Sequence, residues 1–120
     1  MAGFQKAKKE KIWTKILLGG SSGSGKTYSA FRLATGLARK SGGGGIAAID
    51  TEAGRIRYYA DEFDFCDMQL TEPFTPEKYI EAINEAVDSG FKVLIIDSIS
   101  HEWNYCVDIH DKMPGNSWTN

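Results

Sequence analysis

The chain has 120 residues and a mass of 13.2 kDa, which suits one compact domain that buries a core without disulfides or a structural metal. Hydrophobic residues make up 42% and charged residues 25%, a mixture that excludes disordered and collagen-like chains. No apolar run reaches the roughly 18 residues of a membrane span, and no signal-peptide core occurs. We therefore expect a cytoplasmic protein that makes no membrane contact. In that compartment we expect Cys66 and Cys106 to remain reduced thiols.

The net charge of −2 is unevenly distributed. Within residues 1–15 five lysines stand against Glu10, a local charge of +4, so the remainder carries −6. The lysines are Lys6, Lys8, Lys9, Lys11 and Lys15. We expect a basic arm at residues 1–11 ahead of a domain at 12–120. Such an arm can contact nucleic-acid phosphates, but the simpler interpretation is a solvated tail, and the acidic body argues against a reader of duplex DNA.

The first predicted strand, residues 12–18, is apolar enough to lie inside a sheet. A Gly/Ser-rich loop at 19–25 leads from it to a helix that runs from Lys26 to about Lys40. The apolar side of this helix is formed by Ala30, Leu33, Ala34, Leu37 and Ala38.

Strands and helices continue to alternate after this helix. The predicted elements are a strand at 46–50, a short helix at 55–60, a weaker strand at 65–70, a helix from Thr75-Pro76-Glu77 to Gly90, and a strand at 92–97. The apolar positions of the helix that begins at Thr75 are Tyr79, Ile80, Ile83 and Val87. Continuously apolar strands separated by helices are typical of a parallel sheet covered on both faces, so we predict a three-layer α/β fold. The residues after Asp97 are polar, aromatic and turn-rich, and they predict no further strand.

Residues 20–27 match the phosphate-binding pattern G-x-x-x-x-G-K-[ST] at every defined position. Glycine lets backbone N–H groups curl around a polyphosphate, and the following helix turns its N-terminus to the same anion. We expect Lys26 to reach the β- and γ-phosphates of a nucleotide and the Thr27 hydroxyl to bind Mg²⁺; the alternative is a Gly/Ser-rich turn with a chance lysine. The predicted nucleotide contacts are Gly20, Ser21, Ser22, Gly23, Ser24, Gly25, Lys26, Thr27 and Tyr28.

The strand at 92–97 ends in Asp97, which is the Walker B pattern and predicts a second residue of the Mg²⁺ site. Many related ATPases carry a glutamate directly after this aspartate, but here the position is Ser98. We also expect His101, Glu102 and Trp103 to line the rim of the same site.

Another strand end supplies a candidate for the missing glutamate. Asp50-Thr51-Glu52 closes the strand at 46–50, and the carboxyl ends of parallel strands open onto one crevice. Glu52 is therefore the candidate general base, and we count it with Lys26 as catalytic. In the alternative interpretation, Asp50 and Glu52 only cap the next helix.

The runs GSSGSGKT, IAAIDTEAGR and VLIIDSISHEW resemble the RecA-like ATPase core, in particular phage-encoded AAA-type (RecA-like) nucleotide-binding proteins, over about residues 12–118. In that family a D-x-E-like element supplies the catalytic glutamate and the Walker B strand ends in Asp-Ser; Asp50-Thr51-Glu52 and Asp97-Ser98 match both. The resemblance implies ATP and Mg²⁺ as cofactors and ATP hydrolysis in phage DNA recombination or replication. It also implies single-stranded DNA as a partner, assembly into a homo-oligomer, and a bacterial or phage-infected host cytoplasm.

The chain departs from the family pattern after Asp97. In RecA-like sheets the strand between the phosphate-loop strand and the Walker B strand comes later in the chain, but only 23 residues follow Asp97 here. We therefore expect the N-terminal portion of a longer core, truncated after the Walker B strand. Two other functions stay open, a small P-loop kinase and a nucleotide-binding or oligomerisation module without turnover.

Overall fold

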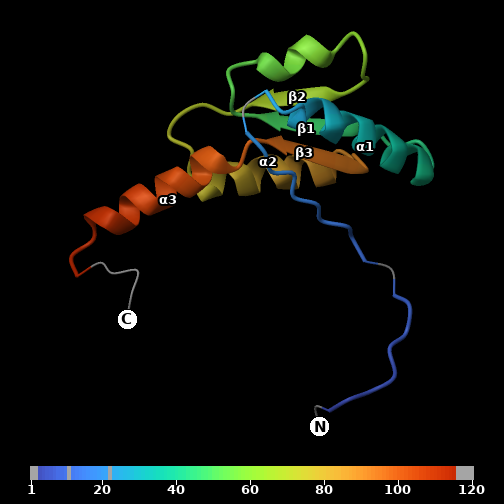
Figure 1. Cartoon of the computed structure of the whole chain (residues 1–120), viewed down its shortest axis with the longest axis horizontal. Helices are drawn as coiled ribbons and strands as arrows, with labels where there is room; N and C mark the ends of the chain where they lie inside the picture. Colours follow the sequence, from blue (N-terminus) through green and yellow to red (C-terminus); the bar gives the residue numbers. More distant parts are fainter. Residues whose placement is uncertain (1–2, 11, 22, 116–120) are drawn as a thin grey trace.

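The computed structural model describes residues 3–10, 12–21 and 23–115 (Figure 1). The described elements are α1 (Lys26–Lys40), β1 (Ile46–Asp50), the 3₁₀ helix η1 (Arg55–Tyr59), β2 (Cys66–Gln69), α2 (Pro76–Asp88), β3 (Val93–Asp97) and α3 (Ser100–Lys112). The strands form one sheet in the order β2-β1-β3, and both pairings are parallel. The predicted α/β fold with a parallel sheet is confirmed.

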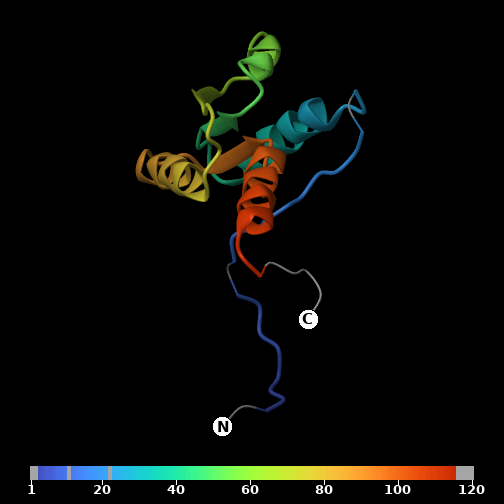
Figure 2. The ribbon, with the colours of Figure 1, turned by 90° about the vertical axis from the view of Figure 1, so that its left-hand side faces the viewer.

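Helices α1 and α2 lie on opposite sides of the sheet, which gives the fold its three layers (Figure 2). Strand β1 is central, and all five of its residues are buried. Ile46 and Ala48 belong to the two apolar clusters that α1 covers. Because side chains alternate along a strand, Ala47 and Ile49 face the side of α2.

The largest fully buried side chain of the core is Phe31, on α1. Its ring centroid lies 5.2 Å from that of Phe63, 4.5 Å from that of Phe65 and 5.9 Å from that of Tyr59. This aromatic cluster joins α1 to η1 and to the start of β2.

The helices bury somewhat different faces from those that their apolar spacing predicts. The buried positions are Phe31, Ala34 and Ala38 on α1 and Tyr79, Ala82 and Ala86 on α2. Of the predicted positions, Leu33, Ile80 and Val87 are exposed. On each helix two alanines and one aromatic residue face the sheet, because small side chains let the helix backbone approach closely while the aromatic ring fills the remaining space.

The predicted strand at 12–18 is wrong. These residues form no regular element, and they follow an extended path along which Trp13 is 78% exposed and Leu17 86% exposed. An extended apolar segment becomes a strand only where a neighbouring edge accepts its backbone hydrogen bonds. No described strand pairs with residues 12–18, and the outer edge of β3 is likewise unpaired among the described residues.

Helix α3 is an element that the sequence did not predict. It extends away from the sheet (Figure 1), and none of its side chains is buried. A helix without a buried face leaves only a weak hydrophobic pattern in the sequence. An ion pair between Lys112 and Asp108, with 2.8 Å between nitrogen and oxygen, joins successive turns of α3. No helix in the described part of the chain is long and apolar enough to cross a membrane.

We predict that Phe31→Ala lowers the free energy of unfolding by about 3–5 kcal/mol, because it removes the ring around which the aromatic cluster packs. Leu33→Ala on the same helix is the matched control; Leu33 is 41% exposed, and we expect a loss of less than about 1 kcal/mol. Urea denaturation followed by circular dichroism measures both. Equal losses would show that the cluster is not the centre of the core.

Candidate nucleotide-binding site

The phosphate loop leads directly into α1. Gly23 and Gly25 have φ angles of 79° and 88°, in the left-handed region that favours glycine, and Gly25 is the N-cap of the helix. The Ser24 N–H donates to the Ser21 carbonyl at 3.2 Å, which closes a turn within the loop. Ser22, a predicted nucleotide contact, lies outside the described residues.

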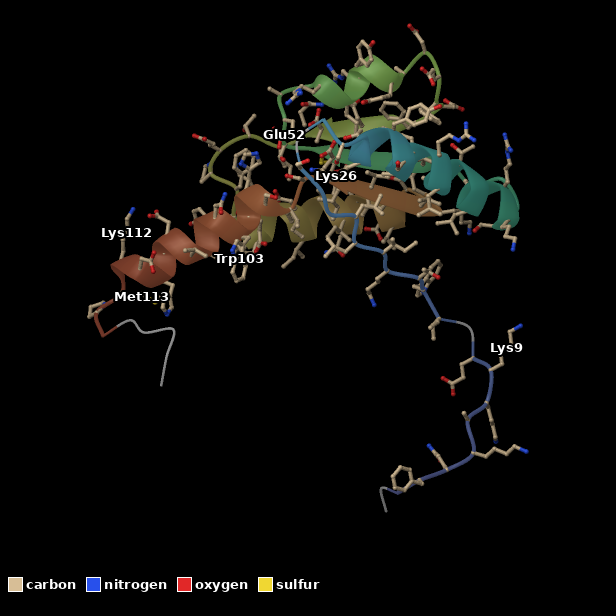
Figure 3. The ribbon with its side chains drawn as sticks, viewed as in Figure 1. Lys9, Lys26, Glu52, Trp103, Lys112 and Met113 are labelled. Carbon is tan, nitrogen blue, oxygen red and sulfur yellow. The ribbon has the colours of Figure 1, made fainter. Side chains whose placement is uncertain are left out.

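The Lys26 side chain folds back over this loop. Its ammonium group donates hydrogen bonds to the carbonyl oxygens of Gly20 and Ser21, the second at 3.3 Å. The positive charge therefore lies against the loop whose sequence predicts phosphate binding. Figure 3 shows Lys26 at the point where the N-terminal segment enters α1.

Thr27 and Asp97 come together although 70 residues separate them. The Thr27 hydroxyl donates to Asp97 Oδ2 at 3.0 Å, which links the first turn of α1 to the carboxyl end of β3. A hydroxyl and a carboxylate are the oxygen donors that Mg²⁺ prefers, so the two residues fit such an ion. The described residues contain no cluster of three or more His, Cys, Asp or Glu side chains that could hold a metal, and Mg²⁺ commonly completes its shell with phosphate oxygens and water.

Asp50 is fully buried at the end of β1, and its carboxylate is occupied by structural hydrogen bonds. It accepts from the Glu52 backbone N–H at 2.7 Å and from the Gln69 side-chain amide at 3.0 Å. Asp50 thus fixes the backbone of Glu52 and is itself enclosed, but it does not cap the next helix, because the N-cap of η1 is Gly54 and no side chain caps that helix. Gln69, on β2, is a member of this network that sequence reasoning missed.

Thr51 connects the ends of β1 and β3. Its hydroxyl accepts from the Ser98 N–H at 2.9 Å and donates to the Ser98 carbonyl at 3.3 Å, while its own N–H donates to the Asp97 carbonyl at 2.9 Å. The Tyr79 hydroxyl also donates to the Ser98 carbonyl, at 3.0 Å, and burial raises the pKa of Tyr79. Sequence reasoning missed both Thr51 and Tyr79; for Thr51 the signal available was a hydroxyl directly after a buried strand.

Glu52 is the half-exposed carboxylate of the site, with a side chain that is 35% exposed. Its Oε1 atom accepts from the Ser98 hydroxyl at 3.4 Å and lies 3.1 Å from Nε2 of His101. Glu52 and Lys26 lie at the same end of the sheet (Figure 3). The structure therefore brings Lys26, Thr27, Asp97 and Glu52 to one edge.

Three further predicted contacts lie on helices, Tyr28 on α1 and both Glu102 and Trp103 on α3. Glu102 accepts a hydrogen bond from the Cys106 thiol at 3.4 Å, and Trp103 is exposed on α3 (Figure 3). Tyr28 packs its ring edge-on against Phe63, with centroids 5.5 Å apart, while its backbone lies in the first turn of α1.

Three features together define a P-loop nucleotide-binding domain. They are the parallel α/β sheet, the G-x-x-x-x-G-K-T loop, and the aspartate at the end of a strand that contacts the loop threonine. A family model described as an AAA domain matches residues 13–119, and the chain belongs to this family. Membership establishes a nucleotide-binding domain of the ATPase type. No curated protein and no solved structure matches the chain.

We predict that Thr51→Val lowers the free energy of unfolding by about 1–3 kcal/mol, because it leaves the Ser98 N–H without its side-chain acceptor. Thr71→Val, at an exposed position, is the control for the same chemical change. Denaturation in urea measures the difference. Indistinguishable values would mean that water replaces the Thr51 hydroxyl at no cost.

Proposed function

We propose that this chain binds ATP together with Mg²⁺ and hydrolyses it, as the nucleotide-binding part of a RecA-like core. One observation carries the proposal: the Thr27 hydroxyl lies 3.0 Å from the Asp97 carboxylate, so the end of the Walker B strand reaches the phosphate loop. The half-exposed Glu52 at the neighbouring strand end supports the hydrolytic step.

Lys26 and the loop backbone perform the binding in this proposal. The Lys26 ammonium exchanges its hydrogen bonds to the Gly20 and Ser21 carbonyls for bonds to phosphate oxygens, which are stronger because the acceptor is charged. The N–H groups of the first turn of α1 point to the same anion. Thr27 and Asp97 would hold Mg²⁺, and the ion would supply positive charge beside the phosphates.

Glu52 acts as the general base. Among the described residues, both side-chain contacts of Glu52 end on Oε1, so Oε2 takes a proton from the attacking water. The water oxygen then bonds to the γ-phosphorus while the bond from that phosphorus to the bridging oxygen breaks. The products are ADP and inorganic phosphate.

We further propose that hydrolysis serves phage DNA recombination or replication and responds to single-stranded DNA, with homo-oligomers as the working form. The resemblance to phage-encoded RecA-like proteins supports this role. Four lysines of the N-terminal segment are exposed, and Lys9 lies far from the sheet, where DNA phosphates have free access (Figure 3). The four are Lys6, Lys8, Lys9 and Lys15.

We predict that Lys26→Ala weakens binding of Mg-ATP by at least about 100-fold, because the loop loses the cation that faces the phosphates. Lys40→Ala, at the other end of α1, makes the same change in net charge and is expected to leave binding intact. Fluorescence titration with a labelled ATP analogue measures both. Unchanged affinity in the Lys26 variant would overturn the phosphate-loop assignment.

We predict that Glu52→Gln binds Mg-ATP normally but releases phosphate at least about 100-fold more slowly, because an amide cannot accept the proton. Glu81→Gln on the exposed side of α2 is the control. Phosphate release is measured without DNA, with single-stranded DNA and with duplex DNA, and we expect stimulation by the single strand.

Each competing function has its own result in the same assay. Phosphate that appears on an added acceptor would indicate a small P-loop kinase. Tight Mg-ATP binding without phosphate release under any condition would indicate a nucleotide-binding or oligomerisation module without turnover.

A further inference from the structure

His101 is a titratable side chain in direct contact with the proposed base. It is the second residue of α3, and its Nε2 atom lies 3.1 Å from Oε1 of Glu52. An ionised carboxylate can only accept hydrogen bonds, so Nε2 carries the proton in this contact. The Ser98 hydroxyl donates to the same oxygen from 3.4 Å.

The imidazole is held on a second side by an aromatic ring. Phe74 stacks on His101 with 4.6 Å between ring centroids and an angle of 25° between the ring planes. Phe74 is half-buried in the loop between β2 and α2. This stacking fixes the plane of the imidazole, and so it directs Nε2 at the carboxylate of Glu52.

A free glutamate side chain at this level of exposure would rotate among several conformers, and ordering it costs free energy. The bonds from His101 and Ser98 to Oε1 restrict that rotation. These bonds anchor Oε1 of Glu52 and leave Oε2 as the oxygen that accepts a proton. A base that is held in one orientation reacts faster than one that must first find it.

We propose that His101 is a positioning residue for Glu52, held in place by Phe74, and that it sets the rate of hydrolysis through the orientation of the Glu52 carboxylate. The proposal rests on the proposed function of Glu52 as general base. It assigns to α3 a task in the site, although this helix has no buried side chain of its own.

We expect truncation of His101 to leave the fold in place. The ring is only half-buried, and it borders an open cavity of about 540 Å³ that Phe74, Asn104 and Tyr105 also line. His101→Ala therefore enlarges a solvent-filled space and creates no closed void in the core. A loss of activity in this variant reports on the site.

The contact between His101 and Glu52 can be tested without any turnover. The chain has two histidines, so His110→Gln assigns the imidazole resonances of the full 120-residue chain in an NMR spectrum. We expect Glu52→Gln to shift the His101 resonances and to leave those of His110 in place. Unmoved His101 resonances would overturn the proposal.

The kinetic test compares His101→Ala, His101→Gln and the control His110→Gln, with single-stranded DNA present. We expect His101→Ala to lower kcat about 10- to 100-fold with the dissociation constant for Mg-ATP unchanged. Glutamine restores most of kcat because its side-chain amide can donate to Oε1. Phe74→Leu lowers kcat by a smaller factor because the imidazole keeps its bond but loses its stacking partner.

The outcomes separate this proposal from the one on which it rests. If Glu52→Gln is inactive while His101→Ala keeps full kcat, Glu52 remains the base and the positioning role is overturned. If His101→Ala weakens nucleotide binding but leaves kcat intact, His101 has a structural role and the proposal is likewise overturned. If Glu52→Gln keeps full turnover, the base lies elsewhere and both proposals fail.

Discussion

The parallel register of β1 and β3 is the constraint on which the site depends. Asp50 pairs with Asp97 in this register, so the two strands end at the same level. The Thr51 N–H then continues the ladder to the Asp97 carbonyl, one residue beyond β1. This continuation carries Glu52 to the edge where Thr27 meets Asp97. Residues from three separate parts of the chain converge because the ends of two strands coincide.

Three carboxylates at this edge differ in their surroundings, and their surroundings suit different tasks. Asp50 is fully buried and accepts one hydrogen bond on each oxygen, from Glu52 and from Gln69, so it fixes the backbone. Asp97 is half-buried and accepts a hydrogen bond from the Thr27 hydroxyl, which suits its proposed task as a metal ligand. Glu52 has a side chain that is 35% exposed and has one oxygen anchored by Ser98 and His101. The same functional group, a carboxylate, thus serves as a structural acid in Asp50, as a proposed metal ligand in Asp97 and as a proposed base in Glu52.

The sequence predicts the parts of the fold whose signal is local. Strand β1 and helix α1 have the bounds that the sequence predicted, and the predicted bounds of β2, α2 and β3 differ from the observed ones by about two residues at most. Continuous apolar runs, a capped helix start and a Gly-rich stop are local signals, and each can locate an element without knowledge of its neighbours. Strand pairing at residues 12–18 was predicted wrongly, because apolar character shows that a segment can pair but not that a partner exists. Helix α3 was missed because it buries no side chain.

In the candidate site, too, the sequence predicts the features with a local signal and misses those that depend on three-dimensional contacts. The G-x-x-x-x-G-K-T loop and Asp97 can be found by pattern, since each occupies a strand end or a helix start that the sequence defines. The bonds of Thr51, Gln69 and Tyr79 to this edge could not be predicted, because they depend on which strands are neighbours and on how side chains turn. His101 was expected near the rim, but its pairing with Glu52 and its stacking on Phe74 appear only in three dimensions.

The shared register also determines where the chain tolerates a change in length. Side chains alternate along a strand, so the loss of one residue inside β3 would turn the carboxylate at its end to the opposite face of the sheet, away from Thr27. The segments at 41–45 and 89–92 enter β1 and β3 from their amino ends, a full strand length from the site. Insertions and deletions can accumulate there without moving a site atom. Within the two strands, length is as tightly constrained as the identity of the acids themselves.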